Sequence, residues 1–412
     1  MTTPQTLPRY RWMILAVSWT SCLLVFFARL GIGPLGPFLK ESLEISNAQV
    51  GLLVTASGIT YVPTLVGAGW LVDRVGIKRM LVTGNFIGAI CLIALFFAPS
   101  YQAMFIIMAF SGLGFGCIMP SSVKALILWF PSKERATATG INQSAVNVAG
   151  IVGAATLPTI AFTLGWRYGF LFMGFLALAI CLFCGLVYRN PPDIVLPASA
   201  GDTNKNTSPQ ETTSSPTGRL FRSRDIWMLG LAGFFLCVME FAALTNLVLY
   251  LHESLLFPAV AAGGLLAMTQ FSGAFGKPGS GLISDRLLGG RRKILLMLMA
   301  GAASIMCLAL GLISSNFGWL LYPILVILGV TAIGWGGLYS ALAGELAGKE
   351  AAGKALGITA AILVLGAMTG PPVFGYIVDI TGSYQLAWLS MALCGVISVA
   401  LAYLVREHKR RL

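Results

Sequence analysis

The chain has 412 residues, of which 57% are hydrophobic and only 10% charged, and its mean hydropathy is +0.84. Soluble domains carry about 25% charged residues, so this composition excludes an ordinary soluble protein and indicates a polytopic membrane protein. The formal net charge is +12. In a soluble protein that charge would suggest a nucleic-acid partner, but its placement along the chain, described below, indicates a membrane topology and excludes nucleic acid.

Apolar runs of about 20 residues or more, long enough to cross the hydrocarbon core of a bilayer, recur along the chain. The first is too long for a cleavable signal peptide and no small-residue cleavage site follows it, so we expect it to be retained. Several runs contain Gly and Pro, which membrane helices tolerate. We predict twelve membrane-spanning helices, at approximately 12–38, 48–72, 79–99, 102–130, 138–164, 168–188, 226–251, 258–284, 294–314, 317–343, 355–378 and 384–405.

Lys and Arg are distributed unequally between the two sides of these predicted helices. With the N-terminus placed inside, 22 of the 27 Lys and Arg residues fall in inside segments, and only Lys40 and Arg167 fall outside. Because Lys and Arg are in excess in cytoplasmic loops, we expect both termini to be cytoplasmic, in a bacterial or archaeal inner membrane.

The two halves of the chain repeat one plan. Residues 190–224 are polar and rich in Pro, Ser, Thr and Asn, which predicts a flexible cytoplasmic linker. The linker separates an N-terminal six-helix bundle, 1–189, from a C-terminal one, 225–412. Each bundle contains a similar loop, "GWLVDRVGIKR" at 69–79 and "GLISDRLLGGRRK" at 281–293. Parallel six-helix repeats are typical of carriers that rock one half against the other around a central site.

Both loops resemble the signature loop of the major facilitator superfamily, and the resemblance covers nearly the whole chain. It implies an all-α membrane protein with twelve transmembrane helices in two six-helix bundles. In that family the Asp and Arg of the loop latch helix ends across the interface between the halves. The resemblance therefore assigns a gating role to Asp73, Arg74, Asp285 and Arg286. An ion pair that exists in only one of two conformations biases the equilibrium between them.

Three cations, Arg29, Lys124 and Lys277, remain within predicted spans. A charge at the bilayer centre costs at least about 2.5–3.5 kcal/mol, so each needs a partner or a water-filled cavity. Lys124 lies five residues before Trp129, about 8 Å from the inner surface, where its side chain could also reach the interface. The acid nearest mid-membrane, Glu240, cannot neutralise three cations. The excess positive charge predicts an anionic substrate in a central aqueous cavity.

A closer resemblance sharpens this prediction. "ARLGIGPLGPFLKESLEIS", which contains Arg29, resembles the first helix of the anion:cation symporter family, the relatives of sugar-acid and vesicular glutamate carriers. "YVPTLVGAGWLVDRVG" resembles the second helix of that family, whose substrate-facing Tyr matches Tyr61. "SSVKALILWFPSKERA" resembles its fourth helix, with Lys124 in place of an Arg, which keeps the charge but not the bidentate geometry. Lys277 resembles a basic residue on the eighth helix of monocarboxylate and oxalate carriers.

One departure concerns proton coupling. The symporter family often has an Asp, implicated in proton coupling, before the first-helix Arg, and this chain has Ala28 there. Glu240 is therefore the proton-coupling candidate, although it would also serve as a permanently protonated residue that bonds a neighbouring helix. Anion exchange without a proton is the alternative mechanism.

Further polar residues within the spans are Asn147, Asn246, Gln270 and Tyr339. We include them as candidates for the substrate site, although hydrogen bonding between helices or packing is the commoner role for each alone. The eight Cys residues all lie in apolar runs, where they behave as small hydrophobes.

We predict a secondary transporter that moves a small organic anion, a carboxylate, dicarboxylate or sugar acid, by alternating access with a proton or a counter-anion. Sulfonates and other oxyanions are the alternative substrate class. A drug exporter on the same fold would favour intramembrane acids instead, and a transporter-like sensor would bind without flux. An enzyme would need a catalytic constellation, but the two His residues, His252 and His408, lie near helix ends. We expect no catalytic residues, metal site or cofactor. One bundle of six plus six helices can function as a monomer.

Overall fold

Twelve helical spans, long and apolar enough to cross a membrane, make up the described chain. The computed structural model describes residues 7–131, 134–189, 223–289, 291–313, 315–347 and 352–406. The twelve predicted spans are confirmed, and the chain is a multi-pass membrane protein. The predicted linker, 190–224, lies almost wholly outside the described residues, so the domain boundaries stay a prediction.

The N-terminal half contains the first six spans. The first of them is divided into α1 and α2, and the other five are single helices. In chain order they are α1 (Leu7–Leu30), α2 (Ile32–Leu43), α3 (Asn47–Val75), α4 (Ile77–Phe96), α5 (Tyr101–Trp129), α6 (Arg135–Leu164) and α7 (Trp166–Val187).

The C-terminal half contains the other six spans, and the tenth of these is divided. In chain order they are α9 (Arg224–Glu253), α10 (Ala259–Arg286), α11 (Arg292–Leu312), then η2 (Ser315–Leu320), α12 (Leu321–Leu328), η3 (Gly329–Ile333) and α13 (Gly336–Ala347), then α14 (Ala352–Thr381) and α15 (Tyr384–Leu404).

Several helices start at residues whose local chemistry explains the boundary. Ser46 caps α3 by accepting a hydrogen bond from the Gln49 amide, and the Gln49 side chain returns a bond to the Ser46 amide, which completes a capping box. The chain leaves α6 through Gly165, whose φ of 104° suits glycine and disfavours any residue with a Cβ. Tight connections of this kind hold consecutive spans antiparallel.

Two spans are irregular where hydropathy alone predicts one continuous helix. The first span is interrupted at Gly31, and Pro34 then lacks the amide hydrogen that would bond Leu30. The tenth span contains one π-helical turn, Gly329–Ile333. A Cβ at Gly329 would lie 2.1 Å from the Thr269 carbonyl oxygen, so the missing side chain lets this turn contact the α10 backbone.

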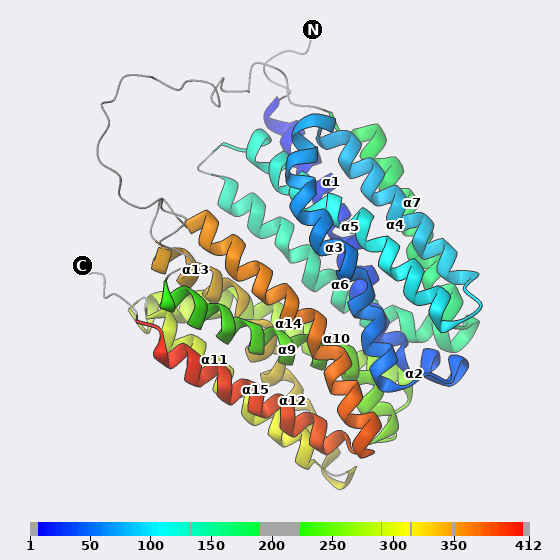
Figure 1. Cartoon of the computed structure of the whole chain (residues 1–412), viewed down its shortest axis with the longest axis vertical. Helices are drawn as coiled ribbons and strands as arrows, with labels where there is room; N and C mark the ends of the chain where they lie inside the picture. The colour runs from blue at the N-terminus through cyan, green and yellow to red at the C-terminus, as the bar shows by residue number, and fades with distance from the viewer. Residues whose placement is uncertain are drawn as a thin grey trace.

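The two halves lie side by side (Figure 1), and each contributes most residues of one hydrophobic cluster. We call the end of the molecule that contains residues 189 and 223 the linker end, and the opposite end the distal end. The seam between the halves pairs α3 with α14, α6 with α10, and α2 with α9. The α3–α14 and α2–α9 pairs meet through segments nearer the distal end, whereas the α6–α10 contact extends past mid-helix to Asn147 and Lys277.

Glycine brings the seam helices into backbone contact. A Cβ at Gly51 of α3 would lie 2.5 Å from the Pro371 carbonyl carbon of α14, and one at Gly33 of α2 would lie 2.6 Å from the Leu244 carbonyl oxygen of α9. Gly263 of α10 approaches α6 in the same way. Small residues of this kind allow close helix packing within a membrane. The seam is therefore closed by backbone contact from mid-molecule to the distal end.

The charge asymmetry predicted from the sequence appears between these two ends. Lys40 and Arg167 lie at the distal end, on α2 and at the start of α7. The described basic residues of the predicted inside set lie at the linker end: Arg11, Arg74, Lys78, Arg79, Arg135, Arg189, Arg224, Arg286, Arg291, Arg292, Lys293 and Arg406.

Candidate functional site

Arg29 is a buried cation near mid-molecule. It lies on the last turn of α1 and is only 6% exposed. Its guanidinium carbon lies 5.1 Å from the ring centroid of Tyr61 on α3, which is a cation–π contact. Its Nε finds no hydrogen-bond partner in the described structure, and no carboxylate there forms an ion pair with it. Burying a charge without a counter-charge is costly, so the burial of Arg29 calls for a physical explanation.

Lys277 is the corresponding cation of the C-terminal half. It lies on α10, and its Nζ donates a hydrogen bond of 2.9 Å to Oδ1 of Asn147 on α6. That bond crosses the seam. Gly276 lets the α10 backbone approach the tenth span, because a Cβ there would lie 2.6 Å from the Val330 carbonyl oxygen. The seam therefore holds Lys277 with a neutral partner, which leaves its positive charge uncompensated by direct pairing.

Glu240 lies in the same half as Lys277. Among the described residues, no direct ion pair joins their side chains. The Glu240 carboxylate accepts a hydrogen bond of 3.1 Å from Trp335 Nε1, which also lies 2.9 Å from the Ala332 carbonyl oxygen. Trp335 lies two residues after Ile333, the last residue of the π-helical turn. A change in the charge of Glu240 would thus reach the irregular part of the tenth span through Trp335.

Lys124 lies apart from these two cations. It forms an ion pair with Asp73 of α3, beside a groove of about 430 Å³ between α3 and α5. Asp73 and Tyr61 are twelve residues apart on one helix, about 18 Å by helix rise. The structure therefore places Lys124 beside Asp73 near the linker end, away from Arg29. Contact between Lys124 and the substrate stays a prediction, and this arrangement does not favour it.

The other candidates for the substrate site are packed between helices. Asn246, 1% exposed, donates to the carbonyl oxygens of Ala242 and Pro371. Gln270 fills the space that the absent side chain of Gly150 leaves at the seam. Tyr339 meets the Trp335 ring edge to face, with centroids 5.3 Å apart. These contacts favour packing roles for all three in this conformation.

The four signature-loop residues have their described contacts within their own halves. Arg74 stacks over Trp70, with 3.8 Å from the guanidinium carbon to the ring centroid. Asp285 lies 3.9 Å from Arg292, and Arg286 is exposed. The latch across the halves that the family resemblance implies therefore stays a prediction, for a conformation in which the linker end is closed.

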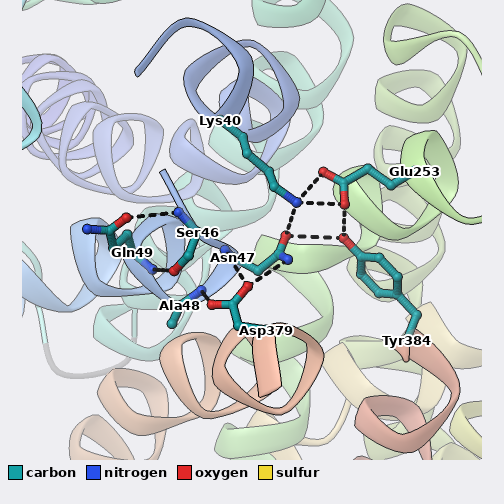
Figure 2. A network of polar contacts seen from close by, with 8 residues as sticks. All are labelled: Lys40, Ser46, Asn47, Ala48, Gln49, Glu253, Asp379 and Tyr384. Carbon is teal, nitrogen blue, oxygen red and sulfur yellow. Dashed lines mark hydrogen bonds and ion pairs between the residues drawn. The ribbon is translucent and has the colours of Figure 1, made fainter. Parts of the chain in front are cut away.

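Two clusters of polar side chains were not predicted. One joins Cys22, Ser122 and Asn142 from α1, α5 and α6, with Asn142 Nδ2 lying 3.1 Å from Ser122 Oγ. The second lies at the distal end and joins the halves through Lys40, Asn47, Glu253, Asp379 and Tyr384 (Figure 2). The sequence signals for the second were Lys40, placed outside, and two acids just beyond the predicted ends of spans, Glu253 and Asp379.

Comparison with known proteins agrees with this architecture. A sequence profile of the Major Facilitator Superfamily matches residues 18–363. A probable sulfoacetate transporter of Cupriavidus necator is 27% identical over 408 residues, 95% of this chain and 93% of that protein. A probable galactarate/D-glucarate transporter of Bacillus subtilis is 23% identical over 421 residues, 96% of this chain and 91% of that protein.

A solved structure shares the fold. A bacterial homologue of the human lysosomal transporter Spinster, crystallised in an inward-facing and unoccupied conformation, matches with a TM-score of 0.79 over 98% of each chain, at 16% identity. The profile match runs from the first span into the eleventh. The chain therefore belongs to the major facilitator superfamily, whose members are membrane transporters.

Proposed function

We propose that the chain is a secondary transporter for a small organic anion, which binds near mid-membrane between Arg29 of the N-terminal half and Lys277 of the C-terminal half. The observation that carries this proposal is Arg29, which is 6% exposed and has no carboxylate partner in the described structure. An anion in contact with both cations would offset the free-energy cost of their desolvation. It would also bridge the two halves that move during transport.

The relatives support this class of substrate. The two reported above are named as probable transporters of sulfoacetate and of galactarate or D-glucarate, all of which are small organic acids. The predicted drug-exporter alternative would favour intramembrane acids, whereas Glu240 is the acid that accompanies Arg29 and Lys277 at mid-membrane. We therefore place the substrate among carboxylates, sugar acids and sulfonates.

We further propose that the linker end faces the cytoplasm of a bacterial cell. The excess of basic residues at that end supports this orientation. The seam is closed toward the distal end, and the signature-loop residues contact their own halves. With this orientation, the structure corresponds to an inward-facing carrier.

We assign proton coupling to Glu240, and the alternative is exchange of one anion for another. An anion that draws Lys277 away would weaken the stabilisation that Lys277 gives to the Glu240 carboxylate. Anion binding and proton binding would then favour each other, as symport requires.

The proposal is tested by uptake into proteoliposomes. The panel contains sulfoacetate, galactarate, D-glucarate and a series of monocarboxylates, with a hydrophobic cation as the comparison for a drug exporter. Arg29→Gln should weaken anion binding about tenfold or more, because a hydrogen bond to a charged group contributes roughly 1.5–3 kcal/mol.

Arg167→Gln is the matched control, because Arg167 also lies over an aromatic ring, that of Trp166, but at the distal end. It should leave affinity unchanged. Transport of the cation and of none of the anions would overturn the proposal, as would an Arg29→Gln carrier that folds and binds the anion with wild-type affinity. Anion binding without flux would identify a sensor instead.

A further inference from the structure

The polar cluster at the distal end, which we call the distal-end network, is built around one amide side chain. Its members are Lys40, Asn47, Glu253, Asp379 and Tyr384. Asn47, the first residue of α3, is 4% exposed. Its Oδ1 accepts a bond of 3.1 Å from Lys40 Nζ, and its Nδ2 donates one of 2.9 Å to Asp379 Oδ1 on α14. The Tyr384 hydroxyl lies 3.2 Å from the same Oδ1 (Figure 2). Both the oxygen and the nitrogen of the Asn47 amide therefore have partners, and each contacts a residue of the other half, Tyr384 and Asp379 respectively.

Asp379 also caps a helix that belongs to the other half. Its carboxylate accepts the backbone amides of Asn47, at 2.9 Å, and Ala48, at 2.8 Å. The first amides of a helix have no partner within the helix, and its N-terminus carries partial positive charge. A carboxylate at this place makes charge-assisted hydrogen bonds. The start of α3 is thus satisfied by a group that must leave when the halves separate at this end.

A second bridge runs parallel to the first. Lys40 of α2 pairs with Glu253 of α9 at 2.8 Å. The Tyr384 hydroxyl lies 2.8 Å from Glu253 Oε2, and so donates either to Glu253 or to Asn47. Because Lys40 and Tyr384 also contact Asn47, the two bridges share this residue. Breaking one removes a partner from the other.

The surroundings allow the network to open. A cavity of about 680 Å³, lined in part by Lys40, Glu253, Asp379 and Tyr384, adjoins it. Lys40 and Glu253 keep 29% and 27% of their side-chain surface exposed. Water can therefore solvate the charges once they separate, so opening does not leave them stranded in an apolar core.

We propose that Asn47 is the coupling residue of an outer gate, in which the Asp379 cap on α3 and the Lys40–Glu253 pair open and close as one unit. The gate sets the ratio of distal-closed to distal-open carrier. The gate would act whenever the two halves of this chain rock against each other, and it does not depend on which substrate binds near Arg29. Asn47 and Asp379 are positioning residues, because they act through helix ends and not through the substrate.

The test measures the distance across the distal end without substrate. Spin labels at Ser42 of α2 and Gln385 of α15, both exposed, report the separation of the halves by electron–electron double resonance, in a background that lacks the native Cys. Asn47→Asp keeps an acceptor for Lys40 and Tyr384 but turns a second carboxylate toward Asp379. It should raise the distal-open to distal-closed ratio at least tenfold, which corresponds to about 1.4 kcal/mol.

The reciprocal change distinguishes a gate from a general defect. Asp379→Asn added to Asn47→Asp restores a donor opposite the new carboxylate and should return the distance distribution toward wild type. Asp225→Asn is the matched control, because Asp225 also accepts a backbone amide, that of Arg406, but within one half. It should leave the distribution unchanged.

Folded Asn47→Asp with wild-type distances would overturn the proposal, and so would the absence of rescue in the double variant. If Asn47→Asp does not fold, Asp379→Asn and Lys40→Gln carry the test singly. Each should shift the distribution toward longer distances, and wild-type distances in both would overturn the gate. Since no anion is present, these outcomes are independent of the proposed substrate site.

Discussion

Lys277 and Asn147 are joined by a hydrogen bond of 2.9 Å that crosses from α10 to α6. If Lys277 binds the anion and Asn147 only holds its ammonium group, the two residues should respond differently to substitution. Lys277→Gln should weaken anion binding about tenfold or more, because a charged hydrogen bond is lost. Asn147→Ala should change affinity less than about threefold, because the charge remains and a neutral hydrogen bond contributes only about 1 kcal/mol. Equilibrium binding to purified protein measures the anion affinity of both variants. Equal losses of affinity would mean that the Lys277–Asn147 hydrogen bond, and not the Lys277 charge alone, supports anion binding.

Glu240→Gln should abolish accumulation driven by a proton gradient while exchange of labelled for unlabelled anion survives. Gln keeps an oxygen that can accept from Trp335 Nε1, so the contact with the tenth span is preserved while the titratable proton is lost. Glu345→Gln is the comparison, because Glu345 pairs with Arg292 at the linker end of the same half. Accumulation that persists in Glu240→Gln would remove this residue from coupling and would favour exchange or another proton site.

Lys124→Gln should leave anion affinity within about threefold of wild type, because Lys124 pairs with Asp73 and lies far from Arg29. Asp73→Asn should behave in the same way in a binding assay. A tenfold loss of affinity in Lys124→Gln alone would return this residue to the substrate site, in the role that the family resemblance assigns to it.

The orientation is measured with two single Cys residues in a background that lacks the native Cys. Ser42→Cys, exposed at the distal end, should react with an impermeant thiol reagent added outside intact cells. Leu287→Cys, 77% exposed where α10 ends at the linker end, should react only after the membrane is permeabilised. The reverse pattern would show that the proposed topology is inverted, and the structure would then correspond to an outward-facing carrier.

The fold could be predicted from the sequence because each span is a long apolar run, and such runs have one stable solution in a bilayer. The interruptions at Gly31 and at the π-helical turn were missed, because hydropathy does not depend on hydrogen-bond register. Both depend on how the backbone of one helix meets that of another.

The buried cation Arg29 was visible in the sequence because a charge within an apolar run is rare and costly. The partnership between Asn47 and Asp379 was not, because it joins residues 332 positions apart and an acid at the end of a span looks like a solvated helix terminus. Lys124 shows the converse case. Its depth could be estimated from helix rise, but its choice of Asp73 as partner depended on tertiary packing.

The glycines of the seam have a consequence for the speed of the cycle. The seam must separate and close again in every cycle. Closure is slow if it has to return long side chains to single rotamers, since ordering such a side chain costs up to about 1.5–2 kcal/mol. At Gly33, Gly51 and Gly263 the contact is made by backbone that is already ordered within a helix. The seam can therefore reseal with little loss of side-chain entropy, and a single added methyl group at one of these positions would act as a wedge that holds the distal end apart without altering any charge.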